Sequence, residues 1–264
     1  MIETIVQIIT TNLIAILAFF FVAWIISLIT KDASIADVFW GLGFILVSVL
    51  TFIFYKGYYA RAIIIVTLVI LWGLRLSIYI FYRKRGKGED PRYTAMRNTN
   101  PKNFWIISLF KVFWLQGLLL IIISISAQIG IAAQQPSDIM VTDYIGIMVW
   151  LTGFIFETVA DIQLYKFIHN PANAGKVMNQ GLWYYSRHPN YFGESLMWWG
   201  IFIIALPVPY GIITIISPIW ITYMLLKVSG VTLLESSLKE KRPEYVDYIK
   251  TTSAFIPLPK KKLE

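Results

Sequence analysis

Long, nearly uninterrupted apolar runs dominate the chain. Seven of them are each about long enough for a helix that crosses roughly 30 Å of hydrocarbon, and they lie near residues 5–29, 38–55, 62–82, 104–132, 142–165, 191–206 and 209–234. Only 14% of the residues are charged, whereas a soluble domain has about 25%. We therefore expect an all-α polytopic membrane protein with seven transmembrane helices and a short amphipathic C-terminal tail.

Basic residues gather in alternate connections between these runs. Loops 83–103 and 166–190 and the C-terminal tail carry most of them, while loops 133–141 and 207–211 have none. Because Lys and Arg are retained on the cytosolic side, this bias places the N-terminus outside and the C-terminus in the cytosol. We expect a multi-pass protein of a bacterial inner membrane.

The chain lacks an obvious internal boundary. It shows no tandem repeat, low-complexity tract or long linker, so we expect a single membrane domain over residues 1–264, in which residues 235–264 form a cytosolic interfacial tail. The tail reads as one or two helices around Pro243. The opening Met1-Ile2-Glu3-Thr4 lacks a positive n-region, so we expect the first run to be a retained span.

Several classes of chemistry are excluded or disfavoured. There is no cysteine, which removes disulfides, thiolate catalysis and iron–sulfur clusters. The two histidines, His169 and His188, lack the spacing of a metal site, so no metal is expected. No glycine fingerprint or P-loop for a nucleotide is present. The net charge of +8 follows membrane topology, which argues against a nucleic-acid partner.

One face of the fifth apolar run is polar. Glu157 and Asp161 are four residues apart, which places both carboxylates on the same side of a helix. Tyr165, Lys166 and His169 continue this face toward the next loop. Ionisable groups within spans are costly and mark candidate sites, although snorkelling or structural ion pairs are the alternative reading.

The densest polar signal is residues 181–194. Pro189 suits the first turn of a helix, where free backbone amides attract anions. Cationic and polar side chains flank that turn: Arg187, His188, Asn190, Tyr191 and Glu194. A structural cap with an interfacial aromatic belt would need the proline and the tyrosines, but not this concentration of charged and amide groups. The segment is therefore our main candidate for a binding site.

Taken together, these motifs resemble a known family. Over residues 35–260 the chain resembles the membrane steroid 5α-reductase superfamily, and more closely its bacterial branch, DUF1295. The resemblance rests on Asp37-Val38-Phe39-Trp40-Gly41, Leu71-Trp72-Gly73-Leu74-Arg75, Arg187-His188-Pro189-Asn190-Tyr191-Phe192-Gly193-Glu194, Glu244-Tyr245-Val246-Asp247-Tyr248 and Phe255-Ile256-Pro257. The short motifs are weak individually but specific in this order.

This resemblance implies a seven-helix fold that opens to the cytosol, binds NADPH in its C-terminal half and reduces an activated C=C bond of a hydrophobic, lipid-like small molecule. The family's cofactor-contact positions correspond to Asp161, Asn190 and Glu194, and these are adjoined by Arg187, His188 and Tyr191.

Two positions depart from the family pattern. Glu157 stands where steroid reductases often have Asn, and Glu235 lies near a place where they have basic or histidine residues. Since an acidic residue disfavours a phosphate, the resemblance leaves NADH open beside NADPH.

For catalysis, the resemblance implies a carboxyl group on the second helix and a tyrosine on the third. Asp37 matches the carboxyl, whereas the tyrosine position falls on Trp72, so Tyr79 is a substitute candidate. Arg75 would orient Asp37 or contact the cofactor. These donors would stabilise the enolate that forms when hydride attacks an enone.

Two other classes remain open. Membrane methyltransferases that resemble isoprenylcysteine carboxyl methyltransferase share the Arg-His-Pro-x-Tyr motif and bind S-adenosylmethionine, but they typically have a Glu-Glu pair where this chain has Glu235-Ser236. A non-enzymatic lipid-binding or transport protein would use the buried charges to line a substrate path. Membrane lipids are expected partners in every case, and no protein partner is predicted.

Overall fold

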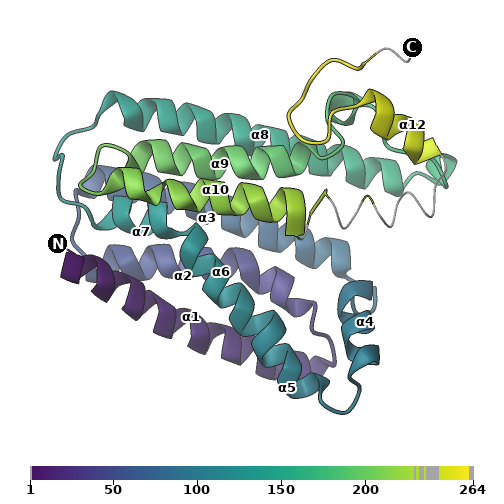
Figure 1. The fold of residues 1–264 in the computed structure, drawn as a ribbon, viewed down its shortest axis with the longest axis horizontal. Coiled ribbons are helices and arrows are strands. Elements are labelled where there is room, and N and C mark those ends of the chain that lie inside the picture. Colours follow the sequence, from purple (N-terminus) through teal and green to yellow (C-terminus); the bar gives the residue numbers. More distant parts are fainter. Residues whose placement is uncertain (1, 229, 232–234, 236–243, 262–264) are drawn as a thin grey trace. The chain divides into compact units, whose positions relative to one another are not determined.

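The computed structural model describes residues 2–228, 230–231, 235 and 244–261, which are mainly helical (Figure 1). The chain forms two compact units. Unit 1 comprises residues 1–143 and 204–217, and unit 2 comprises residues 144–203 and 218–264. The expectation of one membrane domain over the whole chain remains a prediction.

Unit 1 is built mainly from the N-terminal helices. Its elements are α1 (Ile2–Thr30), α2 (Ile35–Phe54), α3 (Tyr59–Lys84), α4 (Pro91–Thr99), α5 (Phe104–Ser108), the π-helical turn η1 (Leu109–Trp114), α6 (Leu115–Ile123), α7 (Ile125–Ala132) and the 3₁₀ turn η4 (Gly211–Ile215). The predicted fourth run, 104–132, is therefore interrupted at Ser124.

Unit 2 contains most of α8 (Val141–Ile168), α9 (Pro189–Ala205) and α10 (Ile216–Tyr223), followed by the π-helical turn η5 (Met224–Val228) and by α12 (Glu244–Thr251). Two 3₁₀ turns, η2 (Pro171–Asn173) and η3 (Gly181–Tyr184), lie between α8 and α9. The interfacial tail helix predicted around Pro243 corresponds in part to α12, while residues 236–243 lie outside the described residues.

Within the described part of the chain, six helical segments are long and apolar enough to cross a membrane. They span Ile2–Thr30, Ile35–Phe54, Tyr59–Lys84, Phe104–Ile123, Val141–Ile168 and Gly211–Val228. The protein is thus of the multi-pass membrane type. The remaining predicted span, 191–206, corresponds to α9 with its 17 residues, so a total of seven spans stays a prediction, as does the orientation of the termini.

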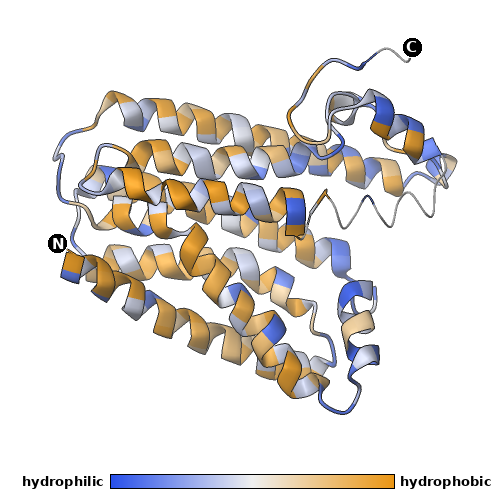
Figure 2. Cartoon of the chain, in the orientation of Figure 1, coloured by the Kyte–Doolittle hydropathy of each residue, from blue (hydrophilic) through white to orange (hydrophobic). Residues whose placement is uncertain are grey.

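Helix α1 exposes apolar side chains and buries a polar one, as expected for a helix surrounded by lipid. Its apolar Ile14 and Ile29 are 65% and 76% exposed, whereas Asn12 is fully buried. The Asn12 amide donates to Thr51 Oγ1 at 2.8 Å and to Gln128 Oε1 at 2.9 Å, which joins α1, α2 and α7. Hydrophobic residues cover most of α1, whereas hydrophilic residues gather on α4 (Figure 2). Hydrocarbon around the helices explains this arrangement, since buried polar groups must then pair with one another.

Glycines bring two helix pairs into backbone contact. In unit 1, a Cβ atom on Gly41 of α2 would lie 2.5 Å from the carbonyl oxygen of Gly73 on α3. In unit 2, a Cβ atom on Gly193 of α9 would lie 2.5 Å from both Gly153 O and Glu157 N of α8. Small residues permit this close approach of membrane helices, so Gly193 of the predicted site segment has a packing role.

In unit 1, a buried ion pair holds the first turn of α3 to the segment that joins α7 to α8. Arg61 Nε donates to Asp143 Oδ1 at 3.0 Å and Nη2 donates to Asp143 Oδ2 at 3.2 Å. The remaining donors bind the carbonyl oxygens of Pro136 and Asp138, both at 2.8 Å. Both ion-pair side chains are fully buried. Arg61 closes this set of contacts, which we call the Arg61 clamp.

Candidate functional site

Helix α9 begins at Pro189, as the sequence predicted. The backbone turns into the helix after His188, whose amide donates to Ser186 Oγ at 3.1 Å. The loop before it, residues 181–188, is tied to α8. The Leu182 amide donates to Gln163 Oε1 at 3.0 Å, and the Trp183 indole donates to the Ala160 carbonyl at 3.0 Å. We call residues 181–188 the connecting loop.

Four polar side chains from α8 and α9 form the centre of the predicted site. Glu157, Asp161 and Glu194 are buried, and Asn190 is half-buried. Asn190 Nδ2 donates to Asp161 Oδ1 at 3.2 Å, so the two helices meet at these two side chains. The opposite atom, Asn190 Oδ1, is buried and accepts no hydrogen bond from the described residues. The group therefore offers hydrogen-bond acceptors.

The last turn of α8 differs from this buried centre. Tyr165, Lys166 and His169 are all exposed. The His169 ring lies 4.0 Å from the Tyr165 ring between centroids, and its Nδ1 lies 2.8 Å from the Tyr165 carbonyl oxygen. The polar face that the sequence predicted as continuous is therefore divided into a buried acidic part and an exposed end.

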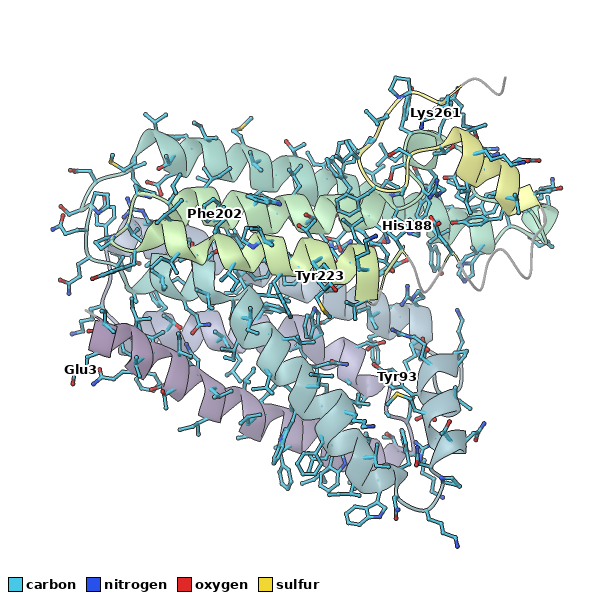
Figure 3. The ribbon with its side chains drawn as sticks, viewed as in Figure 1. Glu3, Tyr93, His188, Phe202, Tyr223 and Lys261 are labelled. Carbon is cyan, nitrogen blue, oxygen red and sulfur yellow. The ribbon has the colours of Figure 1, made fainter. Side chains whose placement is uncertain are left out.

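Arg187 and His188 share one carboxylate. Arg187 Nε donates to Glu235 Oε1 at 2.7 Å, and His188 Nε2 lies 3.2 Å from the same oxygen. The His188 ring, which Figure 3 labels, stacks on Tyr191. The angle between the two ring planes is 1°. Burial alone would raise the pKa of Glu235, but hydrogen bonds from His188 and Arg187 outweigh it and hold that pKa below the ordinary value of 4.5.

A second polar cluster lies in unit 1 at the start of α2. Tyr93 on α4 donates its hydroxyl to Asp37 Oδ1 at 2.7 Å, and Arg92 Nη2 donates to Asp37 Oδ2 at 2.8 Å. Gln116 Nε2 donates in turn to the Tyr93 hydroxyl at 3.2 Å. Asp37 thus acts as an acceptor, and the nearest transferable proton among these contacts is that of Tyr93, which Figure 3 labels on α4.

Burial and the negative charge of Asp37 raise the pKa of Tyr93, so its hydroxyl remains protonated at neutral pH. Desolvation opposes the charge of Arg92, but hydrogen bonding to Asp90 and the charge of Asp37 raise its pKa further. Of the other predicted residues, Tyr79 and Arg75 are half-buried, and the Tyr79 ring packs against Arg83 with the guanidinium carbon 5.4 Å from the ring centroid.

Sequence analysis did not select Tyr93, because it counted residues 83–103 only as a basic loop. A helix-start signal was nevertheless present. Asp90 accepts a hydrogen bond from the Arg92 amide at 2.9 Å and Pro91 occupies the first helical position, which is the pattern of an N-cap followed by proline. That pattern could have predicted α4 and directed attention to its tyrosine.

These residues fit a dinucleotide in one part and not in another. Carboxylate and amide oxygens suit ribose hydroxyls and the amide of a nicotinamide, and the buried Asn190 Oδ1 is an acceptor that such a donor would satisfy. The Arg187 guanidinium already donates to protein oxygens from each of its three nitrogens, so it is not set up as a phosphate ligand. Among the described residues, no group of three His, Asp or Glu side chains could hold a metal ion.

Comparison with known protein families decides the relationship. The family model described as "Protein of unknown function (DUF1295)" matches residues 23–252. The chain belongs to the DUF1295 family. The match covers both the Asp37 cluster and the Asn190 centre, and so confirms the resemblance to DUF1295 drawn from the motifs.

A relative of this DUF1295 protein occurs in the fission yeast Schizosaccharomyces pombe. It is described as an uncharacterized protein, is 28% identical over 264 aligned residues, and the alignment covers 89% of this chain and 76% of the relative. No solved structure matches the chain significantly.

Proposed function

We propose that this DUF1295 protein is a membrane-embedded, NAD(P)H-dependent reductase of an activated C=C bond in a lipid-like substrate such as a steroid or isoprenoid enone. The observation that carries the proposal is the pairing of Asn190 with Asp161 at the first turn of α9. This pairing leaves a buried acceptor, Asn190 Oδ1, without a donor among the described residues. Such a group favours a ligand rich in hydroxyl and amide donors.

The proposal assigns two tasks to two sets of residues. Asp161, Asn190 and Glu194 in unit 2 would hold the nucleoside part of the cofactor, which supplies hydride when bound. The Tyr93 hydroxyl of unit 1 has a single O–H, which it donates to Asp37 in this structure, and it would redirect that O–H to a substrate carbonyl oxygen. When bound, the dinucleotide would supply hydride to the β-carbon and be oxidised, and a proton from water would add to the α-carbon to complete reduction of the C=C bond.

Tyr93 replaces Tyr79 in this proposal because of its position on Asp37. Its raised pKa keeps the phenol protonated, and a fixed neutral donor stabilises the developing enolate oxygen without losing its proton to water. Arg92 holds the other oxygen of Asp37. Asp37 therefore orients the tyrosine, in contrast to our sequence-based prediction that Asp37 itself is the proton donor.

Ligand-induced thermal stabilisation of the purified protein in detergent tests the proposal. NADPH or NADH should raise the melting temperature, because a ligand that binds only the folded state stabilises it. Replacing Asn190 by Ala should abolish this shift. Asn12→Ala is the matched control, since it removes an equally polar buried amide of unit 1 and should lower basal stability without changing the shift.

A turnover assay completes the test. Oxidation of NADPH should depend on an added steroid or isoprenoid enone. Stabilisation by S-adenosylmethionine and by neither dinucleotide would contradict the reductase proposal and favour a methyltransferase. Absence of stabilisation by any of the three compounds would favour a non-enzymatic lipid-binding protein.

A further inference from the structure

Every guanidinium nitrogen of Arg187 donates a hydrogen bond to an oxygen of the protein itself. Besides the two bonds to Glu235, its Nη1 donates to the carbonyl oxygens of Ile249 at 2.9 Å and Thr252 at 2.5 Å. Ile249 lies in the last turn of α12 and Thr252 directly follows the helix, where the last carbonyl oxygens of a helix lack partners within it. Arg187 therefore joins the C-terminal helix to the connecting loop from inside, and it is only 8% exposed.

The chain beyond α12 adds backbone bonds to the same loop. We call residues 252–261 the C-terminal strap. The Arg187 amide donates to Ser253 O at 2.9 Å, Ser186 Oγ donates to Phe255 O at 2.7 Å, and the Leu258 amide donates to Tyr185 O at 3.0 Å. Ser253 also forms a parallel bridge with Ser186, so the strap and α8 both bind the connecting loop.

Glu235 links Arg187 and the strap to the first turn of α9. It receives Arg187 on one side and His188 on the other. The His188 ring in turn stacks on Tyr191, 5.4 Å away between centroids. The Tyr191 ring also lies against Gly230, where a Cβ atom would come within 3.0 Å of it. Moving Arg187 would therefore move the aromatic pair that flanks Asn190.

We infer that Arg187 is a positioning residue, which locks the C-terminal strap onto the connecting loop and so sets the orientation of Asn190 and Tyr191 for cofactor binding. This inference rests on the proposed function. It assigns Arg187 a role through the protein and not through the phosphates of the dinucleotide. A lysine in place of Arg187 would keep the positive charge. It could not make the bidentate contact with Glu235 and also reach both backbone carbonyls.

Arg187→Lys in the full-length protein tests the inference, with Arg61→Lys as its matched control. Both arginines donate to both oxygens of a carboxylate and to two backbone carbonyls, so both variants should lose thermal stability. Only Arg187→Lys should weaken dinucleotide binding, by about tenfold. The loss should be equal for NADPH and NADH, because these differ only in the 2′-phosphate. A loss confined to NADPH would mean that Arg187 contacts that phosphate, and an unchanged Kd would overturn the positioning role.

Hydrogen exchange separates this inference from the proposed function. The Phe192 amide, which donates to His188 O at 3.1 Å, reports on the first turn of α9, and the Leu258 amide reports on the strap. Arg187→Lys should speed exchange at both amides, whereas Arg61→Lys should leave both unchanged. If the wild-type protein binds neither dinucleotide, the proposed function fails. Unchanged exchange at Phe192 in Arg187→Lys would show that the coupling itself is absent.

Discussion

Two buried arginines among the described residues make similar sets of bonds in different surroundings. Arg61 in unit 1 and Arg187 in unit 2 each bind both oxygens of one carboxylate and two backbone carbonyls. Besides its bonds from Arg61, Asp143 accepts a hydrogen bond from the Met140 amide at 2.7 Å. Besides its bonds from Arg187, Glu235 contacts the His188 ring. The Arg61 contacts therefore end at backbone groups, whereas the Arg187 contacts extend through His188 to the first turn of α9.

Arg61 and Arg187 thus show that two arginines with similar hydrogen bonds can have different roles. A buried ion pair is weak evidence for net stability, because desolvation offsets its attraction. What matters is where the contacts lead. The Arg61 clamp ends in a loop and a helix start, and the Arg187 contacts end beside Asn190. Four predictions test this comparison.

The largest expected effect is that of Arg61→Ala. It leaves Asp143 buried without its cation, which should lower the free energy of unfolding by about 3–5 kcal/mol. Denaturant unfolding in detergent, followed by tryptophan fluorescence, measures the change. Any dinucleotide affinity of the protein that remains folded should be that of the wild type. A loss of less than about 1 kcal/mol would mean that the clamp is not the fixed structural element that its burial suggests.

Tyr93→Phe should show that unit 1 has more than a structural role. Removal of the hydroxyl should reduce kcat by about 100-fold, the usual loss for one donor to a developing oxyanion, while leaving dinucleotide Kd unchanged. Steady-state kinetics with an enone substrate measures both. Tyr79→Phe is the control, and a larger loss of kcat in that variant would return the donor role to the tyrosine of α3.

Paired glycine substitutions should affect both units to a similar degree. Gly41→Ala and Gly193→Ala each place a methyl group 2.5 Å from backbone atoms, and overpacking of this kind costs about 1–3 kcal/mol. Unfolding measurements should therefore give comparable losses. Dinucleotide binding should weaken in Gly193→Ala alone, because its methyl group displaces the backbone of Glu157. Equal effects on binding would remove the distinction between the units.

The smallest expected effect concerns pH. Because hydrogen bonds from His188 and Arg187, overcoming burial, hold the pKa of Glu235 below 4.5, its ionised form stabilises the folded state fully above pH 4.5. That contribution is lost as the pH falls through the lowered pKa. The difference in melting temperature between wild type and Glu235→Gln should accordingly shrink below pH 4.5. Glu244→Gln, at an exposed carboxylate, is the control, and a difference that persists in acid would contradict the assignment.

Much of the helical framework could be predicted from the sequence, because the length and hydropathy that a membrane-crossing helix needs are properties of one continuous segment. The long helices α1, α2, α3 and α8 lie close to their expected runs, and α9 begins at the predicted proline. The buried state of Glu157 and Asp161 also follows from their spacing on one helical face. These features depend on local sequence alone.

The contacts of Arg187 and Tyr93 could not be predicted in the same way. Arg187 binds Glu235, 48 residues along the chain, and Tyr93 binds Asp37, 56 residues before it. A basic residue at a helix start predicts an anion site equally well whether the anion is a ligand or a distant glutamate. Only the packing of α12 and the strap decides between them, and no periodicity in the sequence encodes that packing.

The strap also has a consequence for the order of events during synthesis. Ser186 and its partner Phe255 are 69 residues apart, so at about 5–20 residues per second the ribosome needs several seconds to make the second after the first. Glu235 follows Arg187 by 48 residues, and the carbonyls of Ile249 and Thr252 follow it by 62 and 65, so for the first part of that interval Arg187 has none of its four oxygen partners. Until those partners are made, the guanidinium must stay hydrated. The N-terminal turn of α9 is consequently among the last parts of the protein to mature, although it is made well before the end of translation.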